Sequence, residues 1–166
     1  MRSSDRGASF TLCGNLGADI DLWEPNVVET APDRLVMLMR AEGVPVKYRA
    51  DSTDGGRTWS GPRVTDIPCA NSKITLLKHG ESVLMLHNPS AQTGWLNRTT
   101  LSLWISRDGC NTWPVKLDLV ESRAADRVIC YPHAFIDAVR QRLYVACDAA
   151  HTHYLFTVSL KDLECA

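Results

Sequence analysis

Short apolar runs and alternating apolar and polar residues dominate the 166-residue chain, and turn residues end each of them. This pattern predicts β-strands. We expect them at residues 26–30, 34–40, 46–52, 73–78, 82–88, 100–107, 115–120, 133–139, 142–148 and 153–160. Short polar connectors such as APD, HGE and RQ join several of these strands into hairpins. No long segment has a 3.6-residue apolar period, so we expect an all-β chain with little helix.

One polar turn sequence occurs twice, at equivalent places in this series of strands. The first copy is DSTDGGRTWS at 51–60, and the second is SRDGCNTWP, which begins at Ser106. A repeat of about 50 residues in an all-β chain is typical of propeller blades with four antiparallel strands each. The chain therefore holds about three such blades.

The residues of the repeated turn suit a structural role. We expect Asp54 to accept hydrogen bonds from the turn backbone, Gly56 to adopt a positive φ, and Trp59 to pack beneath the turn. In the second copy Cys110 stands at the glycine position, which predicts a strained or reshaped turn. The motif resembles the Asp box of sialidases and related propellers. We expect these turns to brace the blades and to carry no chemistry.

Composition excludes several partners. The chain has 18 basic and 19 acidic residues and a net charge of −1, so it lacks the concentrated positive field that nucleic acids require. No apolar run is long enough to span a bilayer, and the N-terminus lacks the apolar segment of a secretory signal. The six cysteines show no metal-ligand spacing. A disulfide framework is conceivable, but six cysteines are sparse for one and no secretory signal is evident, so reduced thiols are favoured and the compartment stays open.

Three segments together resemble one family. WEPNVVETAPDRLVMLMR, HNPSAQTGWLNRTTLSLWISRDGCNTWP and VICYPHAFID resemble the C-terminal half of the exo-α-sialidase (neuraminidase) catalytic domain, over about residues 22–160. The resemblance implies that residues 1–166 form a single partial domain of a six-bladed propeller whose N-terminal blades are missing. It also implies an active site with three arginines around the substrate carboxylate, a tyrosine nucleophile beside a glutamate, and an aspartate as acid/base.

Four positions of that site match residues of this chain. The resemblance makes Tyr131 the nucleophile, Glu24 its partner, and Arg40 and Arg98 two of the arginines. The chemistry fits sialic acid, because the planar guanidinium fork matches a carboxylate and a neutral tyrosine is not repelled by one. A nearby glutamate can accept the phenol proton as general base. Taken singly, each residue also has a structural explanation, such as an ion pair, a snorkelling side chain, a packed ring or a strand cap.

The remaining two positions, the first arginine and the acid/base aspartate, belong to earlier blades of the family. We therefore expect a sialidase-like hydrolase segment that acts on sialylated glycans and is inactive alone. The alternatives are a non-catalytic module that binds glycans or protein, and a relative that acts on another sugar. The unprotected edges favour self-association or pairing with a missing N-terminal half. We expect no cofactor and no metal, since the spacing of His87, His133, His151 and His153 matches no metal site.

Overall fold

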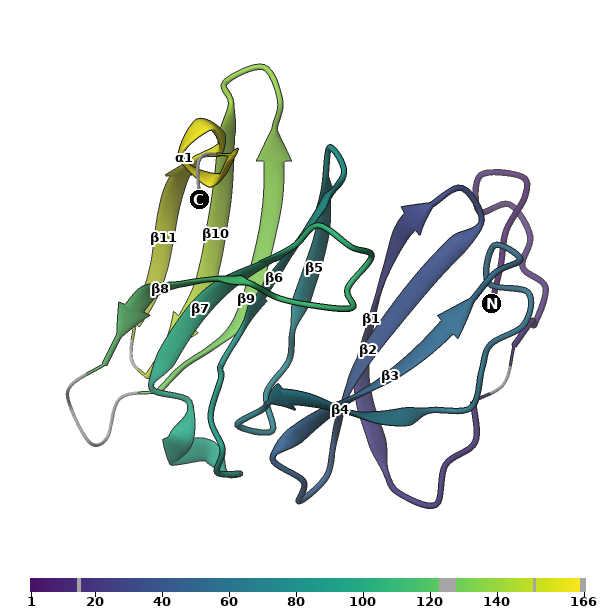
Figure 1. Ribbon diagram of the computed structural model, residues 1–166, viewed down its shortest axis with the longest axis horizontal. Coiled ribbons are helices and arrows are strands. Elements are labelled where there is room, and N and C mark those ends of the chain that lie inside the picture. The colour runs from purple at the N-terminus through teal and green to yellow at the C-terminus, as the bar shows by residue number, and fades with distance from the viewer. Residues whose placement is uncertain (15, 123–127, 151, 165–166) are drawn as a thin grey trace.

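Three antiparallel β-sheets lie side by side in the computed structural model of the chain (Figure 1). The structure describes residues 1–14, 16–122, 128–150 and 152–164. The first sheet has the order β1-β2-β3-β4, the middle sheet β5-β6-β7-β8 and the third sheet β11-β10-β9. The strands are β1 (Leu22–Ala31), β2 (Arg34–Ala41), β3 (Val46–Ser52), β4 (Arg63–Pro68), β5 (Thr75–His79), β6 (Ser82–His87), β7 (Thr100–Ser106), β8 (Val115–Glu121), β9 (Ile129–Asp137), β10 (Arg142–Ala149) and β11 (Thr152–Ser159).

This arrangement confirms the all-β class and the partial propeller. Among the described residues the third sheet has three strands and not four, because the short helix α1 (Leu160–Glu164) follows β11 and packs Leu160 and Leu163 into the core. Strand β4 is missing from the sequence prediction. It is an outer strand in which only Ile67 is buried, so its sequence shows no clear alternation. In the described part of the chain, no helix is long and apolar enough to cross a membrane.

The middle sheet is covered on both faces. On one face Leu84, Leu86 and Leu103 join a core shared with the third sheet and α1. On the other face Met85 and Trp104 join Val36 and Leu38 in a core shared with the first sheet. Because successive strand residues point to opposite faces, two buried faces require a continuous apolar run. The runs SVLMLH and TLSLWIS in β6 and β7 meet this requirement.

The two predicted Asp-box turns join the third and fourth strands of the first two sheets, and their hydrogen bonds match. In the first, Ser52 Oγ donates to Asp54 Oδ1 (2.9 Å), and Thr58 donates to Asp54 from its backbone N (2.9 Å) and its hydroxyl (2.6 Å). Ser106, Asp108 and Thr112 repeat these bonds in the second turn. Cys110 has a φ of 66°, in the left-handed region of Gly56, so this turn is strained but not reshaped.

A third Asp-box turn, which the sequence analysis missed, lies at the N-terminus. Ser3 Oγ donates to Asp5 Oδ1 (2.7 Å), and Ser9 donates to Asp5 from its backbone N (2.9 Å) and its hydroxyl (2.5 Å). A β-bridge between Arg2 and Thr11 closes the turn. Its sequence SSDRGASF has serine and phenylalanine where the other copies have threonine and tryptophan. Residues 1–12 therefore have the structure of the outer part of another blade.

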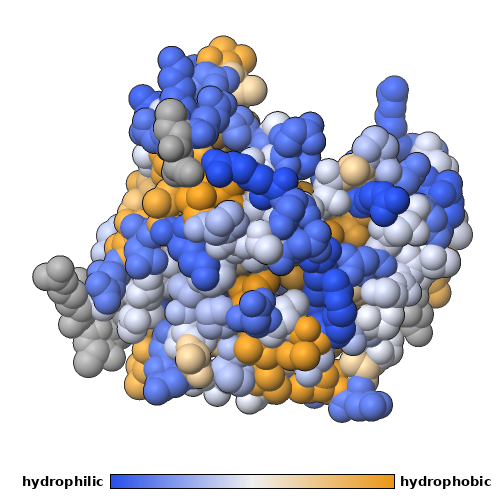
Figure 2. Space-filling model, in the orientation of Figure 1, coloured by the Kyte–Doolittle hydropathy of each residue, from blue (hydrophilic) through white to orange (hydrophobic). Residues whose placement is uncertain are grey.

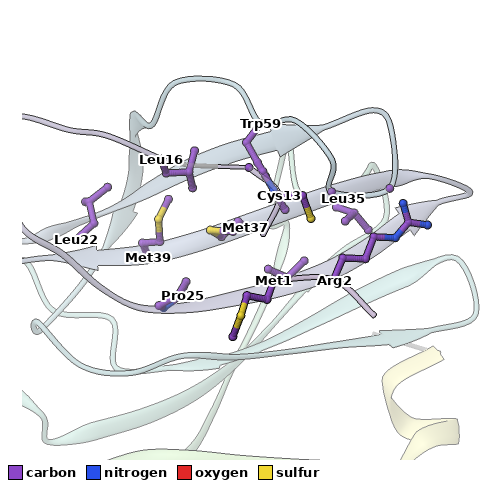
Figure 3. Close-up of a pocket in the computed structure, with 14 residues that line it drawn as sticks. Met1, Arg2, Cys13, Leu16, Leu22, Pro25, Leu35, Met37, Met39 and Trp59 are labelled. Carbon is purple, nitrogen blue, oxygen red and sulfur yellow. The ribbon is translucent and has the colours of Figure 1, made fainter. Parts of the chain in front are cut away.

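An apolar cavity of about 510 Å³ separates this N-terminal segment from the first sheet (Figure 3). Met37 and Met39 of β2 line one side of it, and Cys13 and Leu16 line the other. Trp59 of the first Asp box also faces it. The outer face of the first sheet is thus only partly covered.

The third sheet also has an exposed apolar face. Phe135 is 57% exposed and stacks on Tyr144 with ring centroids 5.0 Å apart, and Leu155 on the outer strand is 71% exposed. Apolar surface gathers over this sheet at the left of the molecule (Figure 2). The two end sheets of the stack therefore each present a face that a further blade could cover.

Candidate functional site

Two of the predicted site residues occupy the same distorted position in different sheets. Glu24 is the third residue of β1, where Glu24 and Pro25 interrupt the pairing with β2. Tyr131 is the third residue of β9, where Tyr131 and Pro132 interrupt the pairing with β10. Both have a positive φ, 50° for Glu24 and 52° for Tyr131. Bulges of this kind redirect a side chain out of the sheet, and they occur often beside active sites.

The middle sheet has a third residue at this position. Asn71 has a φ of 57° and precedes β5, and its neighbour Ala70 donates to the carbonyl of Asn88 (3.2 Å). Ala70 thus corresponds to Trp23 of the first sheet, which precedes Glu24 and pairs with Arg40. The innermost strands are β1, β5 and β9, the first strands of the three sheets, and each has one strained, non-glycine residue in or shortly before its start: Glu24, Asn71 and Tyr131.

Arg40 connects the first two of these residues. It lies near the end of β2, and its Nε donates to Glu24 Oε2 (2.7 Å) while its Nη1 donates to Asn71 Oδ1 (2.7 Å) and Glu42 Oε2 (3.0 Å). Burial acts to lower the pKa of Arg40, but the bonds and charges of the two glutamates outweigh it and raise the pKa above its ordinary value. The ring of Trp23 lies 5.6 Å from the guanidinium. Arg40 is thus a firmly held cation.

Glu42 is the acidic partner on the solvent side of this group. Asn71 Nδ2 donates to Glu42 Oε2 (3.1 Å). This bond is the largest cause of a lowered pKa at Glu42. The hydrogen bond from Arg40 and the positive charges of Arg40 and Arg98 lower the pKa further. The carboxylate therefore stays ionised and holds the Asn71 amide in a fixed orientation.

Arg98 connects Asn71 to Tyr131 and is less well satisfied. It follows the short 3-10 helix η1 (Trp95–Asn97) and is only 7% exposed. Its Nη2 donates to the backbone carbonyl of Asn71 (2.6 Å), but within the described ranges Nε and Nη1 have no hydrogen-bond partner and no carboxylate pairs with the group. The guanidinium lies 4.8 Å from the ring of Trp95 and 5.6 Å from that of Tyr131. A buried guanidinium with free donors is costly unless an anion binds it.

The thiol beside Tyr131 belongs to the same environment. Burial raises the pKa of Cys130, and the hydrogen-bonding influence and the charge of the nearby Arg98 offset part of this effect. Cys130 therefore remains a neutral, buried thiol at neutral pH.

The structure brings the four predicted residues into one group of contacts: Glu24 with Arg40, Arg40 and Arg98 with Asn71, and Arg98 with Tyr131. Their chemical roles stay predictions. The sequence analysis missed Asn71, Glu42, Trp23 and Trp95. The alignment of ANSK with WEPN and CYPH at the start of each blade was the signal that could have revealed Asn71.

The histidines do not form a metal centre in the described part of the chain. His87 is fully buried edge-on to Trp104, with ring centroids 4.5 Å apart, and burial lowers its pKa well below the ordinary value. His153 contacts Asp148 (3.1 Å), and His151 lies outside the described residues. No group of three or more histidine, cysteine, aspartate or glutamate side chains within those residues could hold a metal ion. The five described cysteines are free, and Cys165 lies outside that part.

Comparisons with known proteins add a family and a fold. The family model described as BNR repeat-like domain matches residues 1–145. The Hadza microbial sialidase Hz136 superposes with a TM-score of 0.76 at 20% identity, over 96% of this chain and 31% of that one. Trypanosoma rangeli sialidase in complex with the inhibitor DANA gives a TM-score of 0.70 at 16% identity, over 98% of this chain and 27% of that one. No curated protein sequence matches.

A third solved structure agrees with these two. The K499G mutant of NanB sialidase from Streptococcus pneumoniae has a TM-score of 0.73 at 14% identity, and the match covers 96% of this chain and 27% of that one. The chain therefore spans about a third or less of the solved structures named here. At these identities the likeness shows the fold.

Proposed function

The chain belongs to the family of BNR repeat-like domains and has a sialidase-like fold, and on that premise we propose that it contributes one side of a sialidase active site. The activity would be release of terminal α-linked sialic acid from glycoconjugates with retention of configuration. Arg40 and Arg98 would bind the substrate carboxylate, Tyr131 would attack the anomeric carbon, and Glu24 would accept the phenol proton.

The observation that carries the proposal is the pair of guanidinium groups on Asn71. Arg40 Nη1 and Arg98 Nη2 both donate to this residue, at 2.7 and 2.6 Å, so two like charges lie close together. Glu24 and Glu42 neutralise Arg40, whereas Arg98 keeps two unpaired donors among the described residues. A ligand carboxylate would supply the missing acceptors, and a bidentate pair with guanidinium is among the strongest charge-assisted contacts in proteins.

The environment of Tyr131 supports its role as nucleophile. Its ring lies against Arg98, so the phenol oxygen would be near the carboxylate that Arg98 binds. A carboxylate nucleophile at this place would repel the substrate, whereas a neutral phenol would not. The left-handed backbone at Tyr131 is a strained conformation that costs on the order of 1–3 kcal/mol, and such strain concentrates at functional sites.

Two half-exposed tryptophans flank the group. Trp23 and Trp95 are 48% and 52% exposed, and each lies against one of the two arginines. An exposed aromatic ring beside a cation can stack on a sugar ring while the cation binds its acidic substituent. This feature serves a hydrolase and equally a non-catalytic module that binds acidic glycans, which is the second candidate function.

Binding of N-acetylneuraminic acid to the Arg98→Met variant tests the proposal. Methionine fills much of the same volume without the charge, so we expect affinity to fall at least about tenfold, the effect of losing one charge-assisted hydrogen bond. Arg140→Met is the matched control, because Arg140 pairs with Asp137 on an exposed hairpin of the third sheet. Titration calorimetry measures both. Equal binding by Arg98→Met and the unchanged protein would refute the site.

Turnover separates the two candidate functions. If the protein hydrolyses a fluorogenic sialoside and the Arg98→Met variant does not, the result supports the hydrolase function. Arg98-dependent binding without hydrolysis by the natural full-length protein supports the binding module.

We also propose that further blades of the same protein pack against the first sheet. The Asp-box turn at residues 3–10 has the structure that joins third and fourth strands in the two complete blades, and the cavity lined by Met37 and Met39 lies beside it. Those blades would supply the acid/base and the first arginine that the resemblance implies. Mass spectrometry of the natural protein tests this. A natural protein of 166 residues that is a stable monomer in light scattering would overturn it.

A further inference from the structure

A buried lysine and a buried cysteine lie in contact beneath the candidate site. Lys47 of β3 and Cys69 are both fully buried, and Lys47 Nζ donates to Cys69 Sγ at 3.1 Å. Cys69 Sγ also lies 3.8 Å from the carbonyl of Ser72. Lysine is almost never fully buried without an acidic partner, so this contact requires an explanation.

No acidic partner neutralises Lys47 within the described residues. The one acidic side chain that influences its pKa among the described residues is Glu24, whose carboxylate is paired with Arg40. Cys69 itself acts to raise the pKa of Lys47, whereas Arg40 and His87, the other charged or titratable neighbours, oppose a second positive charge. Burial, the largest influence, lowers the pKa of Lys47. Burial therefore favours the neutral amine, which lies in contact with the equally buried Cys69 thiol.

We propose that Lys47 and Cys69 form an oxidative modification site, in which one oxygen atom bridges Nζ and Sγ covalently. Molecular oxygen is the oxidant. An N–H bond and the S–H bond break, N–O and O–S bonds form, and the O–O bond is cleaved. The second oxygen atom leaves as water with the remaining two hydrogens, so amine and thiol are oxidised and O₂ is reduced. The 3.1 Å separation lets a single bridging atom join the two side chains with little movement of the backbone.

The bridge would act on the segment that carries Asn71. Cys69 lies two residues before Asn71, which holds Arg40 and Arg98, and Lys47 pairs with Arg40 across β2 and β3. A covalent bridge would fasten this segment to β3. The modification is independent of the proposed function, because its formation requires no sugar ligand.

Mass spectrometry of the full chain tests the proposal. We expect protein purified in air to contain a species heavier by about 14 Da than protein kept under nitrogen, from one oxygen gained and two hydrogens lost. Trypsin should then release residues 41–49 joined to residues 64–73, with no cleavage after Lys47. A thiol or phosphine reductant should restore the two separate peptides.

Matched variants locate the bridge. Lys47→Met and Cys69→Ser should abolish the joined peptide. Lys116→Met, at a lysine that contacts Trp104, and Cys13→Ser should leave it unchanged. If a buried variant fails to fold, the unchanged protein alone decides. Normal cleavage after Lys47 in aerated protein, or oxygen added to Cys69 without a link to Lys47, would overturn the proposal.

Discussion

The Asp-box turns and the candidate site use the same left-handed backbone for different purposes. In the turns the positive φ falls mainly on glycines such as Gly55, Gly56 and Gly109, and the aspartate side chains accept hydrogen bonds within the turn. In the site it falls on Glu24 and Tyr131, each before a proline. The turns satisfy their polar groups locally, whereas the site keeps a buried arginine whose Nε and Nη1 have no partner among the described residues.

This difference in residue type identifies the site as the region whose backbone conformation lowers the stability of the fold. A left-handed glycine is nearly free of strain, whereas a left-handed glutamate or tyrosine costs on the order of 1–3 kcal/mol. Proteins break local rules of this kind mostly at functional sites. Mutations in the turns should therefore change stability without changing function. Mutations in the site should change function and leave stability nearly unchanged.

Tyr131→Phe should have the largest effect. If Tyr131 is the nucleophile, loss of its hydroxyl should lower turnover by the natural full-length protein at least about 10²-fold and leave the melting temperature nearly unchanged. Tyr144→Phe is the matched control, because Tyr144 stacks on Phe135 on the exposed face of the third sheet. Steady-state hydrolysis of a fluorogenic sialoside measures both. Equal rates for the two variants would place the chemistry elsewhere.

Asp54→Ala should lower stability and leave ligand binding unchanged. Its effect in free energy should be smaller than the effect of Tyr131→Phe on turnover. The substitution removes the acceptor of the Ser52 hydroxyl and of the Thr58 backbone N–H and hydroxyl, so unfolding should become easier by about 0.5–2 kcal/mol, as when a helix loses its cap. Urea denaturation measures the change. Asp66→Ala, at an exposed aspartate of β4, provides the control. If Asp54→Ala instead lowered the affinity for sialic acid and left stability unchanged, the turn would have a role in binding and not in stability.

The smallest effect is the acid dependence of the turns. Hydrogen bonds from Ser9, Thr58 and Thr112 lower the pKa of Asp5, Asp54 and Asp108, respectively, each to about 2 from an ordinary 3.8. Because the folded pKa is the lower one, these carboxylates contribute their full stabilisation above pH 3.8, and it disappears as the pH falls toward 2.

Carboxyl chemical shifts measured by NMR should show the three turn aspartates titrating near pH 2. The stability difference between the unchanged protein and Asp54→Asn should also shrink between pH 4 and pH 2. Midpoints near 3.8 would show that the turns do not hold their aspartates in solution.

Much of the fold could be predicted because strands that bury one or both faces carry a recognisable apolar pattern. The runs in β6 and β7 indicated strands, and two Asp boxes indicated blades. The third box was missed because Ser9 and Phe10 replace its usual threonine and tryptophan, and only the hydrogen bonds of Asp5 reveal it. Strand β4 was missed because it is mostly exposed.

The candidate site was predictable only as a set of residues matched to a family. Glu24, Arg40, Arg98 and Tyr131 came from that resemblance, and the sequence contains nothing that specifies the contacts among them. Asn71 joins the two arginines through its side chain and its carbonyl, and a carbonyl has no sequence signature. The Arg98 donors that lack a partner in the described part of the chain depend likewise on tertiary packing.

The three strained positions at the starts of the innermost strands have a consequence for how such a site can evolve. Glu24, Asn71 and Tyr131 are copies of one location in a repeated unit, so duplication of a blade delivers a new side chain to the same site. Each copy can then acquire an acid, an amide or a phenol without any change in the sheets that support it. An engineer could exploit the same symmetry by exchanging side chains among these positions.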